Sequence, residues 1–219
     1  MKKEGLFIST IKQNILKIYN VAFHPTRFFK TVENEPFLTT LLFFLILSGI
    51  IAIITFPVNY FTFQQATAGM IAEIEGATYG TVIALASLGQ YIIKIAGLLF
   101  VTLILHLAVK IMKGQPSYAQ SFKVFVYSFA PILVASIALD YFFLNPILLL
   151  VSMIISLGLF VYQLYLMVIG IRDLHKLSTN RAIKTLLLFI LFVIILAAIL
   201  GIVMLLTALG LQSIGAMAY

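Results

Sequence analysis

The sequence predicts an all-α integral membrane protein, with five transmembrane helices preceded by amphipathic helices on the cytoplasmic membrane surface. Of its 219 residues, 63% are hydrophobic and 10% are charged, whereas a soluble domain of this size carries about 25% charged residues. Several apolar runs reach the roughly 18–20 residues that span a hydrocarbon core. Basic residues also alternate between successive connections, which indicates that these runs cross a membrane.

Residues 1–36 are expected to lie on the cytoplasmic membrane surface. One apolar stripe recurs there at helical spacing: Phe7, Ile11, Ile15 and Ile18. Such a stripe with lysines beside it is typical of an interfacial helix. The pair His24-Pro25 ends this helix and begins a second one, and Pro36 then turns the chain into the bilayer.

The stretch "HPTRFFKTVENEPF" forms the predicted turn from surface to span. We expect Phe28, Phe29 and Val32 to point into the lipid interface. Arg27 and Lys30 then face water or phosphate groups. The stretch serves either as a juxtamembrane anchor or as a docking surface for a cytosolic partner, and the residues alone leave both interpretations open.

Five spans follow within one domain, residues 37–211, and a short tail of residues 212–219 ends the chain. The spans are expected at about 37–56, 85–109, 118–139, 146–171 and 184–211. Pro57 is expected to stop the first span, and a capping box of Ser117 and Gln120 to start the third. Pro146 fits the first helical position of the fourth span, where a missing N–H costs nothing.

The basic residues predict the orientation of the chain. Thirteen of the fourteen lysines and arginines fall before the first span, around the second connection or around the fourth: Lys2, Lys3, Lys12, Lys17, Arg27, Lys30, Lys110, Lys113, Lys123, Arg172, Lys176, Arg181 and Lys184. Because cytoplasmic segments carry the excess of basic residues, the N-terminus is expected inside and the C-terminus outside. The net charge of +7 then reflects topology and attraction to anionic lipid headgroups, and we expect no nucleic acid partner.

A polar group inside the spans is the second feature of interest. Lys94 is the one basic residue away from the cytoplasmic side, and Gln90 and Tyr91 lie within one helical turn of it. A charge inside a membrane is a functional hypothesis by default. Lys94 either snorkels to the outer surface, pairs with an acid on that side (Asp140, Glu73 or Glu75), or lines a path for a solute or proton. Tyr127 and Pro131 in the third span are further candidates, because Pro131 leaves the Tyr127 carbonyl without its usual donor.

The chain offers little for catalysis or for metal binding. It contains no cysteine, no "GxSxG", no "HExxH" and no pair of intramembrane aspartates, so we expect no enzyme activity and no cofactor. His24, His106 and His175 lie near one face but come from separate segments, and we expect no metal site. Ala197 and Gly201 form a small-xxx-small pattern, which leaves homo-oligomerisation open.

Three stretches carry a family resemblance. "HPTRFFK" combines a proline, paired phenylalanines and basic neighbours before the first span. "YAQSFKVFVYSFAPILVA" (118–135) and "YQLYLMVIGIRDLHKLSTNRAIKTLLL" (162–188) cover the third span and the turn from the fourth to the fifth. In order and spacing they resemble the Yip domain of Ypt/Rab-interacting membrane proteins and their prokaryotic relatives.

The resemblance implies a multi-pass protein with five helices and a cytoplasmic N-terminus. Eukaryotic members act in vesicle traffic and bind lipid-modified Rab GTPases. This chain lacks the long polar N-terminal region and the "DLYGP" stretch of those members. It is therefore more similar to the compact prokaryotic members, and we expect it in a prokaryotic cell membrane.

The resulting functional hypothesis is a non-enzymatic membrane scaffold or adaptor. Its basic, aromatic cytoplasmic face would bind anionic lipid headgroups, and a cytosolic or membrane protein as a further partner. The residues expected to bind are Pro25, Arg27, Phe28, Phe29, Lys30, His175 and Arg181. The alternative is a small-solute or ion transporter or channel with a polar path around Lys94.

Overall fold

The computed structural model describes residues 2–67, 76–115, 117–142 and 146–216. These residues contain no strand. They form the helices α1 (Lys2–Phe23), α2 (Pro25–Thr31), α3 (Phe37–Thr67), α4 (Gly76–Ile111), α5 (Tyr118–Phe142), α6 (Pro146–Leu174) and α7 (Thr179–Ala216). In the described part, α3 to α7 are each long and apolar enough to cross a membrane, which confirms the predicted all-α fold with five transmembrane helices.

The helices extend beyond several of the predicted spans. α3, α5 and α6 begin at the expected residues, whereas α4 and α7 begin earlier than their apolar runs. α7 also continues to Ala216, so the described part of the predicted tail, residues 212–216, is helical. A hydropathy run marks the part of a helix that fits the hydrocarbon core, and the helix itself ends only where its backbone pattern is broken.

Pro57 does not end the helix, because α3 passes through Pro57 and ends at Thr67, although the part of α3 that is apolar enough to cross a membrane, Phe37–Val58, ends next to it as expected. A proline removes one N–H and leaves the carbonyl four residues earlier, that of Ile53, without its usual donor. The Tyr141 hydroxyl of α5 donates to the adjacent Ile54 carbonyl at 3.1 Å. Packing against a neighbouring helix is how a span tolerates such an interruption.

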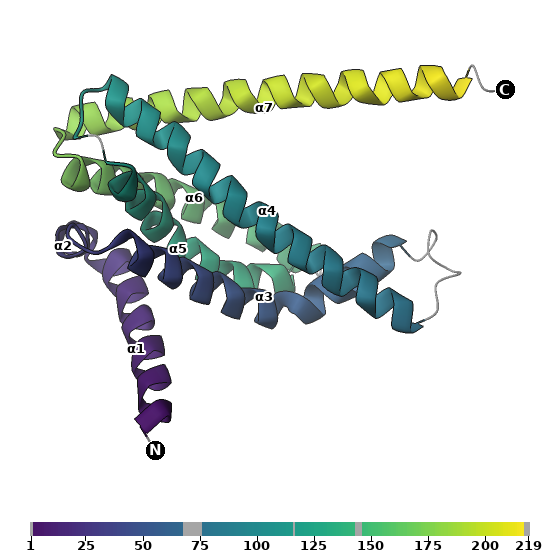
Figure 1. Cartoon of the computed structure of the whole chain (residues 1–219), viewed down its shortest axis with the longest axis horizontal. Helices are drawn as coiled ribbons and strands as arrows, with labels where there is room; N and C mark the ends of the chain where they lie inside the picture. The colour runs from purple at the N-terminus through teal and green to yellow at the C-terminus, as the bar shows by residue number, and fades with distance from the viewer. Residues whose placement is uncertain (1, 68–75, 116, 143–145, 217–219) are drawn as a thin grey trace.

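Helix α5 is the centre of the bundle, as Figure 1 shows. It packs against α1, α3, α4 and α6, while α7 packs against α4 and α6. Its buried face is mainly apolar but also holds Ser121, Lys123, Tyr127 and Ser128. The polar residues that bind other segments therefore lie on α5, the helix that packs against the largest number of other helices.

One end of the bundle gathers α2 and the two short loops that precede α5 and α7 (Figure 1). We call this end the basic end. Both loops follow a helix that closes with a residue in the left-handed conformation, Lys113 at φ 59° and Lys176 at φ 54°. The bonds from Gly114 N to Val109 O and from Leu177 N to Arg172 O complete a Schellman motif at each helix end.

Tyrosine hydroxyls tie neighbouring helices together through backbone carbonyls. Tyr91 of α4 donates to Leu45 O of α3 at 2.9 Å, and Tyr118 of α5 donates to Leu99 O of α4 at 3.0 Å. Tyr162 of α6 donates to the Ala22 carbonyl of α1. In a membrane such interhelical hydrogen bonds contribute about 0.6–2 kcal/mol each, so they help to fix the arrangement of otherwise apolar helices.

Candidate functional site

The turn between α1 and α2 positions the candidate site. The expected break at His24-Pro25 is present, because α1 ends at Phe23 and α2 begins at Pro25. The His24 backbone serves both helices, since its N–H donates to Asn20 O and its carbonyl accepts from Phe28 N. This shared residue changes the chain direction between the two helices, and Figure 1 shows α1 standing at a steep angle to α3.

The paired phenylalanines do not face lipid, which corrects the expectation from the sequence. Phe28, Phe29 and Val32 are buried inside the protein. The Phe28 ring packs edge-on against Tyr127 with centroids 4.9 Å apart, and a Cβ at Gly170 of α6 would lie 2.9 Å from the Phe29 ring. Helix α2 has only 7 residues and cannot hold itself together alone, so its large apolar side chains anchor it on α5 and α6.

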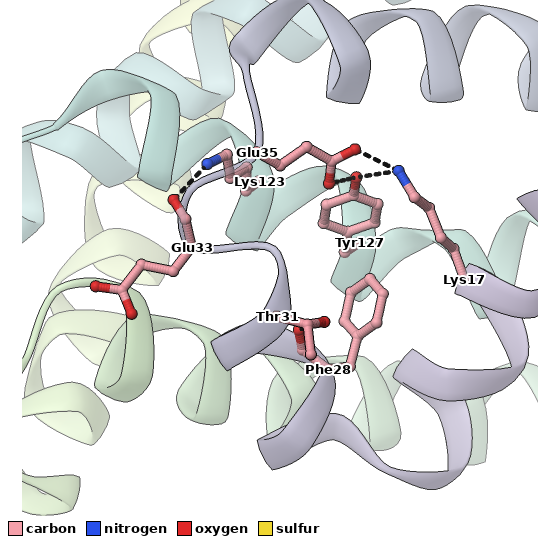
Figure 2. Close-up of polar contacts among 7 residues, drawn as sticks. All are labelled: Lys17, Phe28, Thr31, Glu33, Glu35, Lys123 and Tyr127. Carbon is pink, nitrogen blue, oxygen red and sulfur yellow. Dashed lines mark hydrogen bonds and ion pairs between the residues drawn. The ribbon is translucent and has the colours of Figure 1, made fainter. Parts of the chain in front are cut away.

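A group of polar side chains lies beneath this turn, and Figure 2 shows it. We call it the elbow cluster: Lys17, Glu33, Glu35, Lys123 and Tyr127. Lys17 Nζ forms an ion pair with Glu35 Oε1. The Tyr127 hydroxyl donates to Glu35 Oε2 at 2.7 Å and accepts from Lys17 at 3.3 Å. Three segments, α1, the α2–α3 connection and α5, therefore meet at one carboxylate.

The second part of the elbow cluster holds the end of α2. Lys123 Nζ and the amide nitrogen of Gln120 each donate to the Glu33 backbone carbonyl at 2.8 Å. Figure 2 shows the Glu33 side chain turning away from Lys123, and its carboxylate pairs with Lys176 at 2.6 Å. A cation beside carbonyls that follow a helix C-terminus is stabilising.

The predicted capping box is only half present. Gln120 N donates to Ser117 Oγ at 3.4 Å, as a capping box requires. The Gln120 side-chain oxygen, which would accept from Ser117 N in a complete box, is buried without a hydrogen-bond partner in the described part of the chain. The Gln120 amide nitrogen instead orients the side chain toward the α2–α3 connection by donating to Glu33 O.

Sequence reasoning did not single out the elbow cluster as a unit. Lys17 and Lys123 counted only as topology signals, and Tyr127 was grouped with Lys94. The signal in the sequence was the position of Lys123, a cation within an apolar span. In the structure Lys123 is 2% exposed, and buried lysines are nearly always paired. Its position therefore indicates a carbonyl or carboxylate partner, but the sequence does not identify which one.

His175 is buried between the loops of the basic end, which corrects its assignment to a surface that binds lipid or a partner. Its Nδ1 donates to Gln115 O at 2.8 Å, and Gln115 N donates to His175 O at 3.1 Å. Its Nε2 lies 3.2 Å from Ser121 Oγ. Since Nδ1 carries the proton, Nε2 of the neutral ring accepts from the Ser121 hydroxyl.

The environment of His175 disfavours its charged form. Burial lowers the pKa of His175 below its ordinary value, the hydrogen bond to Gln115 O opposes this, and the nearby His106 adds to the lowering. His106 Nδ1 lies 3.5 Å from the same Ser121 hydroxyl. The neutral imidazole therefore links the two loops by hydrogen bonds, and it is buried away from solvent.

The other predicted binding residues remain accessible. Arg27, Lys30 and Arg181 are exposed, and Pro25 is half-buried. Arg172 of α6, which pairs with Asp173 at 2.6 Å, also lies 3.4 Å from Thr26 Oγ1 and so ties α6 to the start of α2. The basic side chains of α2 thus point outward from a helix that is fixed to the bundle by its phenylalanines.

The intramembrane polar residues do not form one group. Lys94 is exposed, and its charge interacts with that of Asp140. Tyr91 uses its hydroxyl on Leu45 O and Ser48, and Tyr127 belongs to the elbow cluster. About 20 Å of helix separates Tyr127 from Asp140. The side chains of Gln90, Glu73 and Glu75 lie outside the described residues.

Pro131 lies within α5, which continues without a break to Phe142. The hydroxyl of Ser128, the residue after Tyr127, is buried without a hydrogen-bond partner among the described residues, so it does not satisfy the Tyr127 carbonyl that Pro131 frees. Across the described ranges, no three His, Cys, Asp or Glu side chains gather closely enough to hold a metal ion. The chemistry assembled at the basic end is therefore ion pairing and hydrogen bonding around buried cations.

The fold and the elbow cluster define a multi-pass α-helical membrane protein with a short helical arm attached to its bundle. Residues 19–212 match the family model described as the Yip1 domain. Because this match covers most of the 219 residues, the chain belongs to the Yip1 domain family, as the resemblance indicated. No curated protein and no solved structure matches the chain.

Proposed function

We propose that the protein is a non-enzymatic scaffold or adaptor of the cell membrane, whose basic end lies in the cytoplasm and binds anionic lipid headgroups or a partner protein. Arg27 and Lys30 on α2, with Arg181 on α7, are the cations that meet headgroup phosphates. Juxtamembrane cations of this kind contribute about 1 kcal/mol each near an anionic leaflet.

One observation supports this proposal: α1 has an exposed apolar stripe, and the next helix, α2, has exposed cations. On α1 the side chains of Ile15, Tyr19 and Phe23 follow one another at helical spacing and are exposed, Phe23 to 68%. Arg27 and Lys30 lie on the next helix. A helix that presents apolar residues beside basic ones is suited to the boundary between headgroups and acyl chains, and here α1 supplies the apolar part that Phe28 and Phe29 do not.

The proposal is tested by reversing the charges of α2 without disturbing its anchor. We expect the double substitution Arg27→Glu, Lys30→Glu to reduce the anionic lipid that co-purifies with the protein, and to remove the proteins that cross-link to it in membranes. The matched control is Lys110→Glu, which reverses the charge of an exposed residue on α4. It should change neither the co-purifying lipid nor the cross-linked proteins. Unchanged lipid and unchanged cross-links in the double variant would rule the α2 surface out.

A further inference from the structure

Counted together with Lys176, which pairs with Glu33, the elbow cluster has three cations and two carboxylates. Lys17 pairs with Glu35, and the charge of Lys123 also interacts with Glu35. The other carboxylate, that of Glu33, is engaged by Lys176 at 2.6 Å. The charge of Lys123 also interacts with Glu33, so the three ammonium groups of Lys17, Lys123 and Lys176 share two carboxylates.

This imbalance matters because Lys123 is almost completely removed from water. Its side chain is 2% exposed and donates to the neutral Glu33 carbonyl. The effective cost of taking an ion out of water is several kcal/mol unless an opposite charge offsets it. A full ion pair with Glu35 would stabilise Lys123, but it would compete with Lys17 and the Tyr127 hydroxyl, which already occupy the two Glu35 oxygens.

Lys17 is the member of the cluster that another anion can reach. Its side chain is 25% exposed, compared with 12% for Glu35. On α1 it projects from the face opposite Ile15 and Tyr19, because residues two apart do not share a helix face. If the apolar stripe rests at the lipid boundary, as the proposed function requires, the opposite face of α1 and the Lys17 ammonium lie at the level of the headgroup phosphates.

The geometry points to Lys17 as the binding residue for one anionic phospholipid headgroup, whose phosphate replaces Glu35 while Glu35 turns to Lys123. The exchange gives one negative charge for each of the three cations Lys17, Lys123 and Lys176. It also exchanges an internal ion pair that holds α1 for one that holds α1 to the membrane. This inference rests on the proposed placement of α1.

The test is the thermal unfolding midpoint of the full chain in neutral detergent, titrated with phosphatidylglycerol or with phosphatidylcholine. We expect phosphatidylglycerol to raise the midpoint more than phosphatidylcholine does. In Lys17→Gln the phosphatidylglycerol needed for half of the rise should increase roughly tenfold, the effect of about 1.4 kcal/mol of lost binding. Lys12→Gln removes the same charge from an exposed site on the same helix and should change the titration much less.

Glu35→Gln gives the sharper result, because it removes the competitor of the lipid. We expect this variant to bind phosphatidylglycerol more tightly than the unmodified protein does, even where its stability without lipid is lower. A cluster with a structural role alone predicts no such gain, so weaker or unchanged binding in Glu35→Gln would overturn the inference. If Lys17→Gln fails to fold, Lys17→Arg, which keeps the charge, should retain the response, and Glu35→Gln still decides.

Two further outcomes separate this site from the proposed function. If Lys17→Gln responds normally while Arg27→Gln, Lys30→Gln does not, headgroup binding by α2 stands and the Lys17 site is wrong. If inorganic phosphate reproduces the rise, the ligand is a free anion and the assignment to a lipid is overturned. The absence of any preference for phosphatidylglycerol in the unmodified protein would contradict both proposals.

Discussion

At the scale of single residues, His175 shows how one side chain joins two loops of the basic end. Both of its ring nitrogens and its backbone carbonyl have partners, which are Gln115 and Ser121. Gly114 lies against the same contact, because a Cβ there would meet Val109 at 2.8 Å and Leu177 at 3.2 Å. A small residue and a neutral imidazole together allow the loops to approach.

This arrangement predicts that stability falls in acid. The unfolded chain takes up a proton on His175 near its ordinary pKa of 6.5, whereas burial lowers the pKa of the folded state. The unfolded state therefore binds more protons below pH 6.5, so stability is fully present above that value and decreases as the pH falls. We expect the thermal midpoint to drop between about pH 8 and about pH 5.

Two histidine variants test this prediction: His175→Gln removes the buried ring, and His24→Gln is the control. His175→Gln should show a smaller acid-induced drop than the unmodified protein, although its midpoint at neutral pH is lower. His24→Gln changes an exposed ring and should keep the original drop. An equal drop in all three proteins would mean that His175 does not cause it.

At the scale of elements, the seat of α2 on α6 depends on the absence of a side chain at Gly170. A Cβ there would lie 2.9 Å from Phe29 Cζ and 3.2 Å from Val124 Cγ1. Because Phe29 is fully buried, its ring has little room to move. The close approach of the two helices therefore sets the position of the whole arm.

We expect Gly170→Ala to destabilise the protein by about 1–3 kcal/mol, the usual cost of overpacking a core. Gly158→Ala on the same helix is the matched control, since nothing lies within 4 Å of a Cβ there, and alanine favours a helix over glycine by about 1 kcal/mol. Chemical unfolding in detergent measures both. Equal stabilities in the two variants would show that α2 does not pack as described.

The element boundaries show which local rules hold in a span. Pro25 and Pro146 begin helices as their sequence context predicts, because a helix start has no use for their missing N–H. Pro57 does not end α3, since a membrane offers freed backbone groups no water and favours continued helix with help from a neighbour. Tyr141 of α5, which donates to the Ile54 carbonyl next to the one that Pro57 frees, could not be identified from the sequence around Pro57.

At the scale of the whole molecule, α2 and the loops before α5 and α7 lie at one end of the bundle (Figure 1). Most basic residues of the sequence lie in these segments or on the helices next to them. From the positive-inside tendency we expect this end in the cytoplasm, and from an odd number of crossings we expect the ends of α3 and α7 on the other side.

Cysteine labelling checks this orientation, because the chain has no cysteine of its own. We expect a membrane-impermeant maleimide to label Ala72→Cys, in the connection after α3, in intact cells. Ser178→Cys, at an exposed residue of the basic end, should react only after the membrane is opened. Labelling of Ser178→Cys in intact cells would reverse the predicted orientation and remove the cytoplasmic face from the proposed function.

The amino-acid sequence was sufficient for the helical class, the five apolar helices and the break at Pro25, because each depends on hydropathy and backbone chemistry within a few neighbouring residues. It was not sufficient for the direction in which the α2 side chains point, because Phe28 and Arg27 share one short helix whose inner face depends on what packs against it. Contacts between distant residues, such as Lys17 with Glu35 and Lys123 with Glu33, arise only when α5 brings these segments together. Burial then gives them their strength, since a cation withdrawn from water must find an oxygen partner within the fold.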